Sequence, residues 1–140
     1  MCIALVASCS PPEPIPIDYG NAQCVACKMV VSDTRFGAEL VAKTGKTFVF
    51  DSPECLFGWY QSAKVLPVAD VHSLWVTDHA HPATLIDAAK SFYLHSEELQ
   101  SPMSMNVAAF AIEADLKNGL ARYGGEQLSY QQVMDMAKDY

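Results

Sequence analysis

The chain has 140 residues, of which 51% are hydrophobic and 18% are charged, so it can bury a core and is not a disordered chain. Its formal net charge is −7, with 16 acidic against 9 basic residues. That balance argues against binding to nucleic acid or to an anionic membrane surface, because both need clustered lysine and arginine. Five cysteines are too few for a disulfide scaffold of this length.

The first twenty residues differ in character from the rest. The first seven are apolar or small, and Val6-Ala7-Ser8-Cys9 resembles a bacterial lipobox, in which the cysteine is lipidated. Residues 10–20 contain four prolines and a glycine, a composition typical of an extended tether. We therefore expect a signal remnant and tether over residues 1–20, with a lipid anchor on Cys9.

Beyond residue 20, strand and helix patterns follow one another in two similar passes. Ser52 and Pro53 mark the start of a first helix, as an N-cap and a first-turn proline. A second helical pattern ends at Gly124-Gly125, and Ser129 with Gln132 predicts a capping box for a last helix. Strands are predicted at 28–33, 38–43, 47–50, 71–77, 92–94 and 107–112. The mixture indicates an α+β fold, with one half over residues 21–80 and a second over 81–140.

Cys24, Cys27 and Met29 form a C-x-x-C-x-M string where the tether meets the first predicted strand. Thiolate and thioether are soft donors that select Cu(I) over hard cations. Residues two apart in a strand point to the same face, so Cys27 and Met29 are expected to reach one ion. Cys24 could fold back from the preceding turn as a further ligand. The string therefore predicts a soft-metal site.

Three other interpretations of the two cysteines stay open, namely a redox dithiol, half of a zinc site and a plain disulfide. Redox C-x-x-C motifs usually open a helix, whose dipole lowers the thiol pKa, whereas a strand-like segment follows here. A zinc site would need a second C-x-x-C or a suitably spaced histidine pair. The nearby methionine favours the soft-metal interpretation over these three.

A few other side chains are candidates for ligand binding or thiol chemistry. Met103 follows a proline in a polar loop, where a thioether can meet a ligand. Cys55 falls in the first turn of its helix, where the dipole favours thiolate, but its apolar neighbours favour a small buried residue. His79 and His81 could pair as zinc or Cu(II) ligands, although the proline that follows favours a solvated loop. Neither a phosphate loop, a serine triad signature nor a carboxylate pair indicates an enzyme.

Through these motifs the chain resembles the NosL family of nitrous-oxide reductase accessory proteins. Members of that family carry a C-x-M element after a lipoprotein signal and a later proline-methionine loop that leads to an A-F strand. The matching segments are Cys27-Lys28-Met29, Arg35 to Glu39, Phe50-Asp51, Glu54-Cys55-Leu56, Val76-Thr77-Asp78, Ile86-Asp87-Ala88, Ser101-Pro102-Met103 and Ala109-Phe110. The likeness covers residues 21–125.

The resemblance implies a non-enzymatic Cu(I) chaperone, anchored to a membrane in the periplasm, with a fold of two small β-β-α-β-like halves. Its implied partners are nitrous-oxide reductase or another extracytoplasmic copper protein, and a membrane copper-delivery transporter. The implied copper ligands are Cys27, Met29 and Met103, with Cys24 auxiliary. Met105 stays a rival of Met103, because a serine at position 104 replaces the family's glycine. The alternative function is thiol–disulfide exchange by Cys24 and Cys27.

Overall fold

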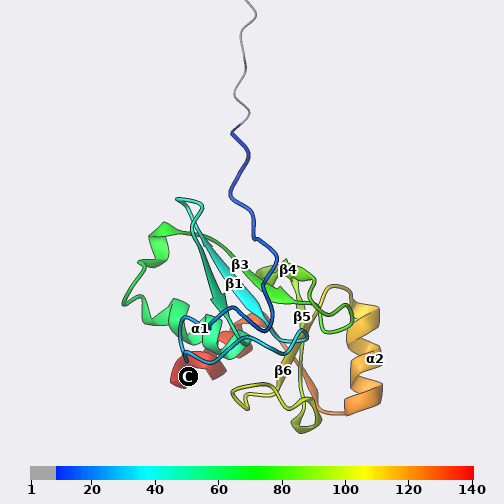
Figure 1. Cartoon of the computed structure of the whole chain (residues 1–140). Coiled ribbons are helices and arrows are strands. Elements are labelled where there is room, and N and C mark those ends of the chain that lie inside the picture. Colours follow the sequence, from blue (N-terminus) through cyan, green and yellow to red (C-terminus); the bar gives the residue numbers. More distant parts are fainter. Residues whose placement is uncertain (1–8) are drawn as a thin grey trace, which may run out of the picture.

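The computed structural model describes residues 9–140, and most of the expected signal segment, residues 1–8, lies outside them. Two antiparallel sheets and three α-helices make a mixed α+β fold, as the sequence predicts (Figure 1). Each sheet belongs to a chain segment with the order strand, strand, helix, strand, so the β-β-α-β-like halves are confirmed. The division at residue 80 stays a prediction.

The first sheet has the strand order β2-β1-β3-β4 and the second has the order β6-β5-β7. The elements around the first sheet are β1 (Ala38–Ala42), β2 (Thr47–Phe50), α1 (Pro53–Ser62), β3 (Val71–Thr77) and β4 (Leu85–Asp87). Those around the second are β5 (Phe92–His95), β6 (Val107–Phe110), α2 (Glu113–Tyr123), β7 (Glu126–Leu128) and α3 (Tyr130–Met136). Short 3-10 turns lie at Val68–Asp70, Ala88–Lys90, Glu97–Leu99 and Ala137–Asp139. β4 and β7 are not predictable from the sequence, because three residues are too few to show a period.

The predicted helix starts are confirmed. Pro53 stands in the first turn of α1, although the Ser52 hydroxyl donates to Oδ1 of Asp51 at 3.3 Å and does not cap the helix. At α3 the capping box is complete: Oγ of Ser129 accepts from the N–H of Gln132 at 3.1 Å, and the N–H of Ser129 donates to Oε1 of Gln132 at 2.8 Å.

The predicted strand at residues 28–33 is wrong. Lys28 has a φ of +68°, a left-handed conformation that interrupts extended backbone. Its N–H donates to the Cys24 carbonyl at 3.0 Å, and the N–H of Cys24 donates to the Met29 carbonyl at 2.8 Å. These bonds close a tight loop over residues 24–29. Cys27 and Met29 therefore do not share the face of a strand.

One hydrophobic core joins the two sheets. Its buried members come from both sheets and from α1 and α3, and include Leu40, Phe50, Leu56, Phe57, Val76, Tyr93, Val107, Ala109, Leu128 and Val133. Tyr93 is fully buried, and its ring meets that of Phe57 edge-on with 6.3 Å between centroids. A second buried cluster packs α2 against β5 and β6.

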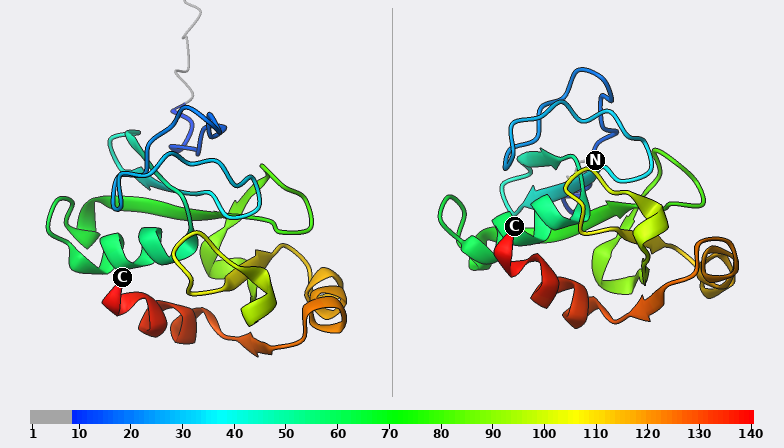
Figure 2. Two further views of the ribbon diagram at one scale, coloured as in Figure 1. Left: turned by 60° about the horizontal axis from the view of Figure 1, so that its bottom comes forward. Right: turned by 90° about the horizontal axis from the view of Figure 1, so that it is seen from below.

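The segment before β1 and helix α3 lie on opposite sides of the molecule in both views of Figure 2. The C-terminal residues return to α1, where a side chain at Gly58 would collide with the carbonyl oxygen of Tyr140. This contact brings the end of the chain beside the helix that carries Cys55. No helix in residues 9–140 is long and apolar enough to cross a membrane.

Candidate metal site

Three thiols and one carboxylate gather where the loop of residues 24–29 meets the start of α1. Cys24 and Cys27 come from the loop, whereas Asp51 and Cys55 come from the junction of β2 and α1. One ligand atom of each residue lies within 4.8 Å of the others. We call these four residues the thiol cluster.

Backbone contacts hold the loop against the first sheet. The N–H of Val25 donates to the Val49 carbonyl of β2 at 2.9 Å, so the loop lies alongside that strand. The ammonium group of Lys28 donates back to the Val25 carbonyl at 2.7 Å and closes the turn. As a result Cys24 is fully buried, whereas Cys27 is partly exposed.

Cys55 and Asp51 are the members of the thiol cluster that were not predicted as ligands from the sequence. Cys55 is 4% exposed, so the prediction of a small buried residue at this position is correct. That prediction did not include the contact of Cys55 with the other members of the thiol cluster. The helix start at Pro53 places the Cys55 thiol near the positive end of the helix dipole. Asp51, between β2 and that helix start, was a local signal that a polar site could lie there.

Hydrogen bonds divide the three thiols into one ionised and two protonated groups. The Cys55 thiol donates to Cys24 and lowers the pKa of Cys24 to about 6, against the opposing effect of burial. Burial raises the pKa of Cys27 to about 11, and its thiol donates to Oδ2 of Asp51 at 3.2 Å. Donation to Cys24, together with burial, also raises the pKa of Cys55. At neutral pH the cluster therefore holds one thiolate between two thiols, a pocket of negative charge on a soft atom.

A cleft of about 410 Å³ leads to this cluster. Cys27 and Cys55 line it together with Met103, Trp59 and Tyr140. The cleft therefore brings a loop thioether to the same space as two thiols, although Met103 is 48 residues beyond Cys55 in the chain.

Met29 and Met105 do not line this cleft. Met105, the rival of Met103 considered from the sequence, is 2% exposed and belongs to the hydrophobic core, where methionine commonly fills gaps. Met29 is 53% exposed at the surface, and its N–H donates to the Cys27 sulfur. The structure therefore brings Cys27 together with Met103, while the Met29 side chain faces solvent.

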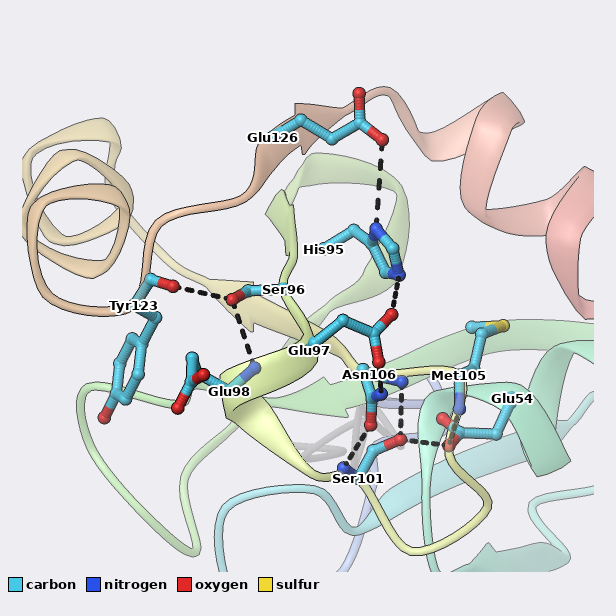
Figure 3. Close-up of polar contacts among 10 residues, drawn as sticks. All are labelled: Glu54, His95, Ser96, Glu97, Glu98, Ser101, Met105, Asn106, Tyr123 and Glu126. Atoms are coloured by element: carbon cyan, nitrogen blue, oxygen red, sulfur yellow. Dashed lines mark hydrogen bonds and ion pairs between the residues drawn. The ribbon is translucent and has the colours of Figure 1, made fainter.

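Glu54 fixes the loop that carries Met103 (Figure 3). Its Oε1 accepts from the hydroxyl of Ser101 at 2.5 Å and from the N–H groups of Met103 at 3.3 Å and Met105 at 3.4 Å. The Ser101 oxygen in turn accepts from the N–H of Asn106 at 2.8 Å. Burial raises the pKa of the Glu54 carboxyl. Because Glu54 precedes Cys55 in α1, one helix end orients both the thiol and the methionine loop.

Comparison with known proteins gives the family. The family model described as NosL matches residues 14–137. The copper-binding lipoprotein NosL of Stutzerimonas stutzeri is 27% identical over 129 residues, which cover 86% of this chain. The chain spans 66% of that relative's length. The crystal structure of the copper chaperone NosL from Shewanella denitrificans has a similar fold, with a TM-score of 0.71, 22% identity, and coverage of 88% of this chain and 96% of that one. This chain belongs to the NosL family.

Proposed function

We propose that this chain is a Cu(I) chaperone that binds the ion at Cys24, Cys27 and Cys55 with Met103 and passes it to an acceptor protein outside the cytoplasm. The observation that carries the proposal is the convergence of three thiols and a loop thioether on one cleft. Thiolate and thioether sulfur are the donors that Cu(I) prefers. Both relatives named above are copper proteins, which agrees with the same cargo here.

The arrangement of the donors suggests how the ion enters and leaves. Cys24 offers a thiolate that needs no deprotonation at neutral pH, since its pKa is lowered to about 6. Cys27 and Cys55 lose their protons as the ion binds, because only the thiolate is a metal ligand. Cys27 and Met103 line the cleft and are partly exposed, whereas Cys55 is buried, so an acceptor's ligand would replace Cys27 and Met103 first. The exposed Met29 thioether, two residues from Cys27, is the candidate for a transient outer ligand during that exchange.

Competition with a chromophoric Cu(I) chelator under anaerobic conditions tests the site. We expect Cys27→Ser and Met103→Leu each to weaken Cu(I) binding by at least about tenfold, equal to ~1.4 kcal/mol. The matched controls are Cys9→Ser, an exposed cysteine outside the cluster, and Met136→Leu in α3. Equal affinity in wild type, Cys27→Ser and Met103→Leu would refute the site.

Delivery and anchoring are the finer parts of the proposal. The acceptor is nitrous-oxide reductase or another extracytoplasmic copper protein, with a membrane copper-delivery transporter as a further partner, and Cys9 carries the lipid that holds the chain in the periplasm. Cys9 is exposed at the start of the proline-rich segment, as an attachment site requires. Copper content of reisolated apo nitrous-oxide reductase after incubation with the loaded chain tests delivery. Membrane release of a Cys9→Ser chain tests anchoring, and retention would contradict it.

Thiol–disulfide exchange by Cys24 and Cys27 is the second candidate. The lowered pKa of Cys24 favours it, because a thiolate is the attacking group in that exchange. Against it, Cys24 is fully buried, and a substrate disulfide must reach the attacking sulfur. Disulfide-reductase activity that Met103→Leu leaves unchanged, without loss of copper affinity in that variant, would favour exchange over copper transfer.

A further inference from the structure

A second group of metal-ligating side chains lies on the side of the molecule that carries α2. We infer that Asp78, His81 and Asp115 form a site for one divalent transition-metal ion, bound through nitrogen and oxygen and separate from the thiol cluster. One ligand atom from each of the three residues lies within 4.8 Å of the others. Nδ1 of His81 and Oδ2 of Asp78 are 2.9 Å apart.

The fold brings the three residues together from distant parts of the chain. Asp78 directly follows β3 and forms an isolated parallel bridge with Ala109 of β6. The chain leaves β6 and begins α2, so Asp115 falls in the first turn of that helix beside the loop that holds His81. The Asp78 N–H donates to the Thr84 carbonyl at 2.9 Å, which closes this loop.

Asp78 is buried, whereas the His81 side chain is exposed. The Asp78 side chain is 3% exposed, and its Oδ1 accepts from the N–H of Ala80 at 3.1 Å. The His81 side chain is 67% exposed, and its Nδ1 pairs with the other oxygen of Asp78. A buried carboxylate beside an exposed imidazole leaves one side of the site open to an entering ion.

The second carboxylate, Asp115, has one oxygen without a hydrogen-bond partner among residues 9–140. Oδ2 of Asp115 is inaccessible to solvent and has no hydrogen-bond partner in the part of the chain that the structure describes. Arg35 and Arg122 line the adjoining cleft, but Arg35 pairs with Asp33 at 2.7 Å and Arg122 lies over the Tyr123 ring at 5.1 Å. Burying a carboxylate oxygen without a partner costs free energy, and a bound cation would remove that cost.

The donor set selects the class of ion. Imidazole with two carboxylates suits Zn²⁺, Co²⁺ and related ions, whereas Cu(I) prefers sulfur. Donor atoms around one such ion lie roughly 3 to 3.5 Å apart, because each bond is about 2.1 Å long. The Asp78–His81 spacing is already close to this. The two sites would therefore sort metal ions by softness, one site for each class.

His79 is not the second histidine of this site. Its ring lies among Phe36, Phe110 and Tyr123, each with a centroid 5.6 Å away, and the residue is 9% exposed. The pairing of His79 with His81 considered from the sequence is therefore replaced by the pairing of Asp78 with His81.

Co²⁺ binding to the full chain, followed by paramagnetic broadening of its NMR signals, tests this site. We expect broadening centred on residues 78–81 and 113–116, and at least about tenfold weaker binding of that ion in His81→Ala and in Asp115→Asn. The matched controls are His72→Ala, an exposed histidine of β3, and Glu113→Gln, an exposed carboxylate of the same helix turn. Circular dichroism of each variant confirms that the fold is intact.

Two results would overturn the inference. One is broadening confined to the residues around Cys24 and Cys27. The other is an equal loss of affinity in His72→Ala and His81→Ala, which would mark adventitious surface binding. Because none of the ligands is a thiol, the outcome is independent of copper binding. Loss of Cu(I) binding in Cys27→Ser with retained Co²⁺ broadening at residues 78–81 would distinguish the two sites.

Discussion

Glu39 is a carboxylate in the middle of β1 that has no exposed surface. Its Oε1 accepts from the N–H of Ile15 at 2.9 Å, while its Oε2 has no partner within residues 9–140. Burial therefore raises the pKa of Glu39 above its ordinary value of 4.5. The residue ties the segment before β1 to the sheet, and it does so at the expense of stability near neutral pH.

The raised pKa of Glu39 predicts a pH-dependent gain from Glu39→Gln. Below pH 4.5 the carboxyl is protonated in both the folded and the unfolded chain, and ionisation costs nothing. As the pH rises from 4.5 to the raised folded-state pKa, wild type loses up to about 1.4 kcal/mol of unfolding free energy per pH unit from this group, and above that pKa the loss is complete. Glutamine keeps the acceptor for Ile15 without a charge. We therefore expect Glu39→Gln to be more stable than wild type at pH 8, with the difference vanishing at acid pH.

Urea unfolding of wild type and Glu39→Gln between pH 4 and pH 8 measures this difference. Glu98→Gln, a change at an exposed carboxylate, serves as the control and should show no comparable trend. A difference between Glu39→Gln and wild type that does not change with pH would show that burial does not disfavour the ionised carboxylate.

At the scale of elements, α1 and the methionine loop act as one support for the thiol cluster. Ser101→Ala should weaken it, because the substitution removes a donor to Glu54 and leaves the N–H of Asn106 without its acceptor. We expect a loss of about 1–3 kcal/mol in stability and weaker Cu(I) binding, since Met103 is no longer held over the cleft. Ser91→Ala removes a hydroxyl that donates to the Asp87 carbonyl elsewhere, and should leave copper affinity unchanged.

Parallel measurements of thermal unfolding and Cu(I) competition separate the two effects of Ser101→Ala. A destabilised variant with wild-type copper affinity would mean that Met103 does not need the Glu54 contacts to reach the ion. In that case Glu54 would support only the fold.

Gly58 decides how the C-terminal residues close on α1. Alanine normally favours a helix over glycine by about 1 kcal/mol, but here its Cβ would collide with the carbonyl oxygen of Tyr140 and lie 2.9 Å from that of Ala137. We expect Gly58→Ala to destabilise the chain by about 1–3 kcal/mol. Gly119→Ala in α2 meets side-chain atoms of Phe110 and Leu94, which can shift, so its loss should be smaller. Thermal unfolding of both variants measures these losses of stability. A Gly58→Ala variant that is more stable than wild type would contradict this packing.

The elements also show what the sequence could and could not predict. The α1 start, β3 and the α3 capping box were predictable, because each depends on residues within a few positions of one another. The path of residues 28–33 was not, since the run of Met29, Val30 and Val31 is typical of a strand while the left-handed Lys28 interrupts it. Burial of Cys55 was predictable from its apolar neighbours. Its meeting with Cys24, 31 positions away in the chain, was not, because periodicity carries no information on distant contacts.

At the scale of the whole molecule, the continuous core links the thiol cluster to the second sheet. Leu56 and Phe57 follow Cys55 in α1 and belong to the same buried cluster as Tyr93 of β5 and Val107 of β6. Because no gap in the core separates the sheets, we expect the chain to unfold as one cooperative unit. The two sheets come from different segments of the chain, but both contribute residues to the same core.

Cu(I) should therefore protect both sheets, although the residues of the thiol cluster all come from the chain segment of the first. A ligand that binds the folded state at 100 times its dissociation constant adds about 2.7 kcal/mol to the free energy of unfolding. In a cooperative chain this gain reaches every amide that exchanges only through global unfolding. Hydrogen exchange with and without Cu(I), read by mass spectrometry over β3 and β5, measures it. The slowest amides of both strands should slow by the same factor, and Cys27→Ser should remove the effect in both. Protection confined to β3 would show that the second sheet opens independently of the copper site.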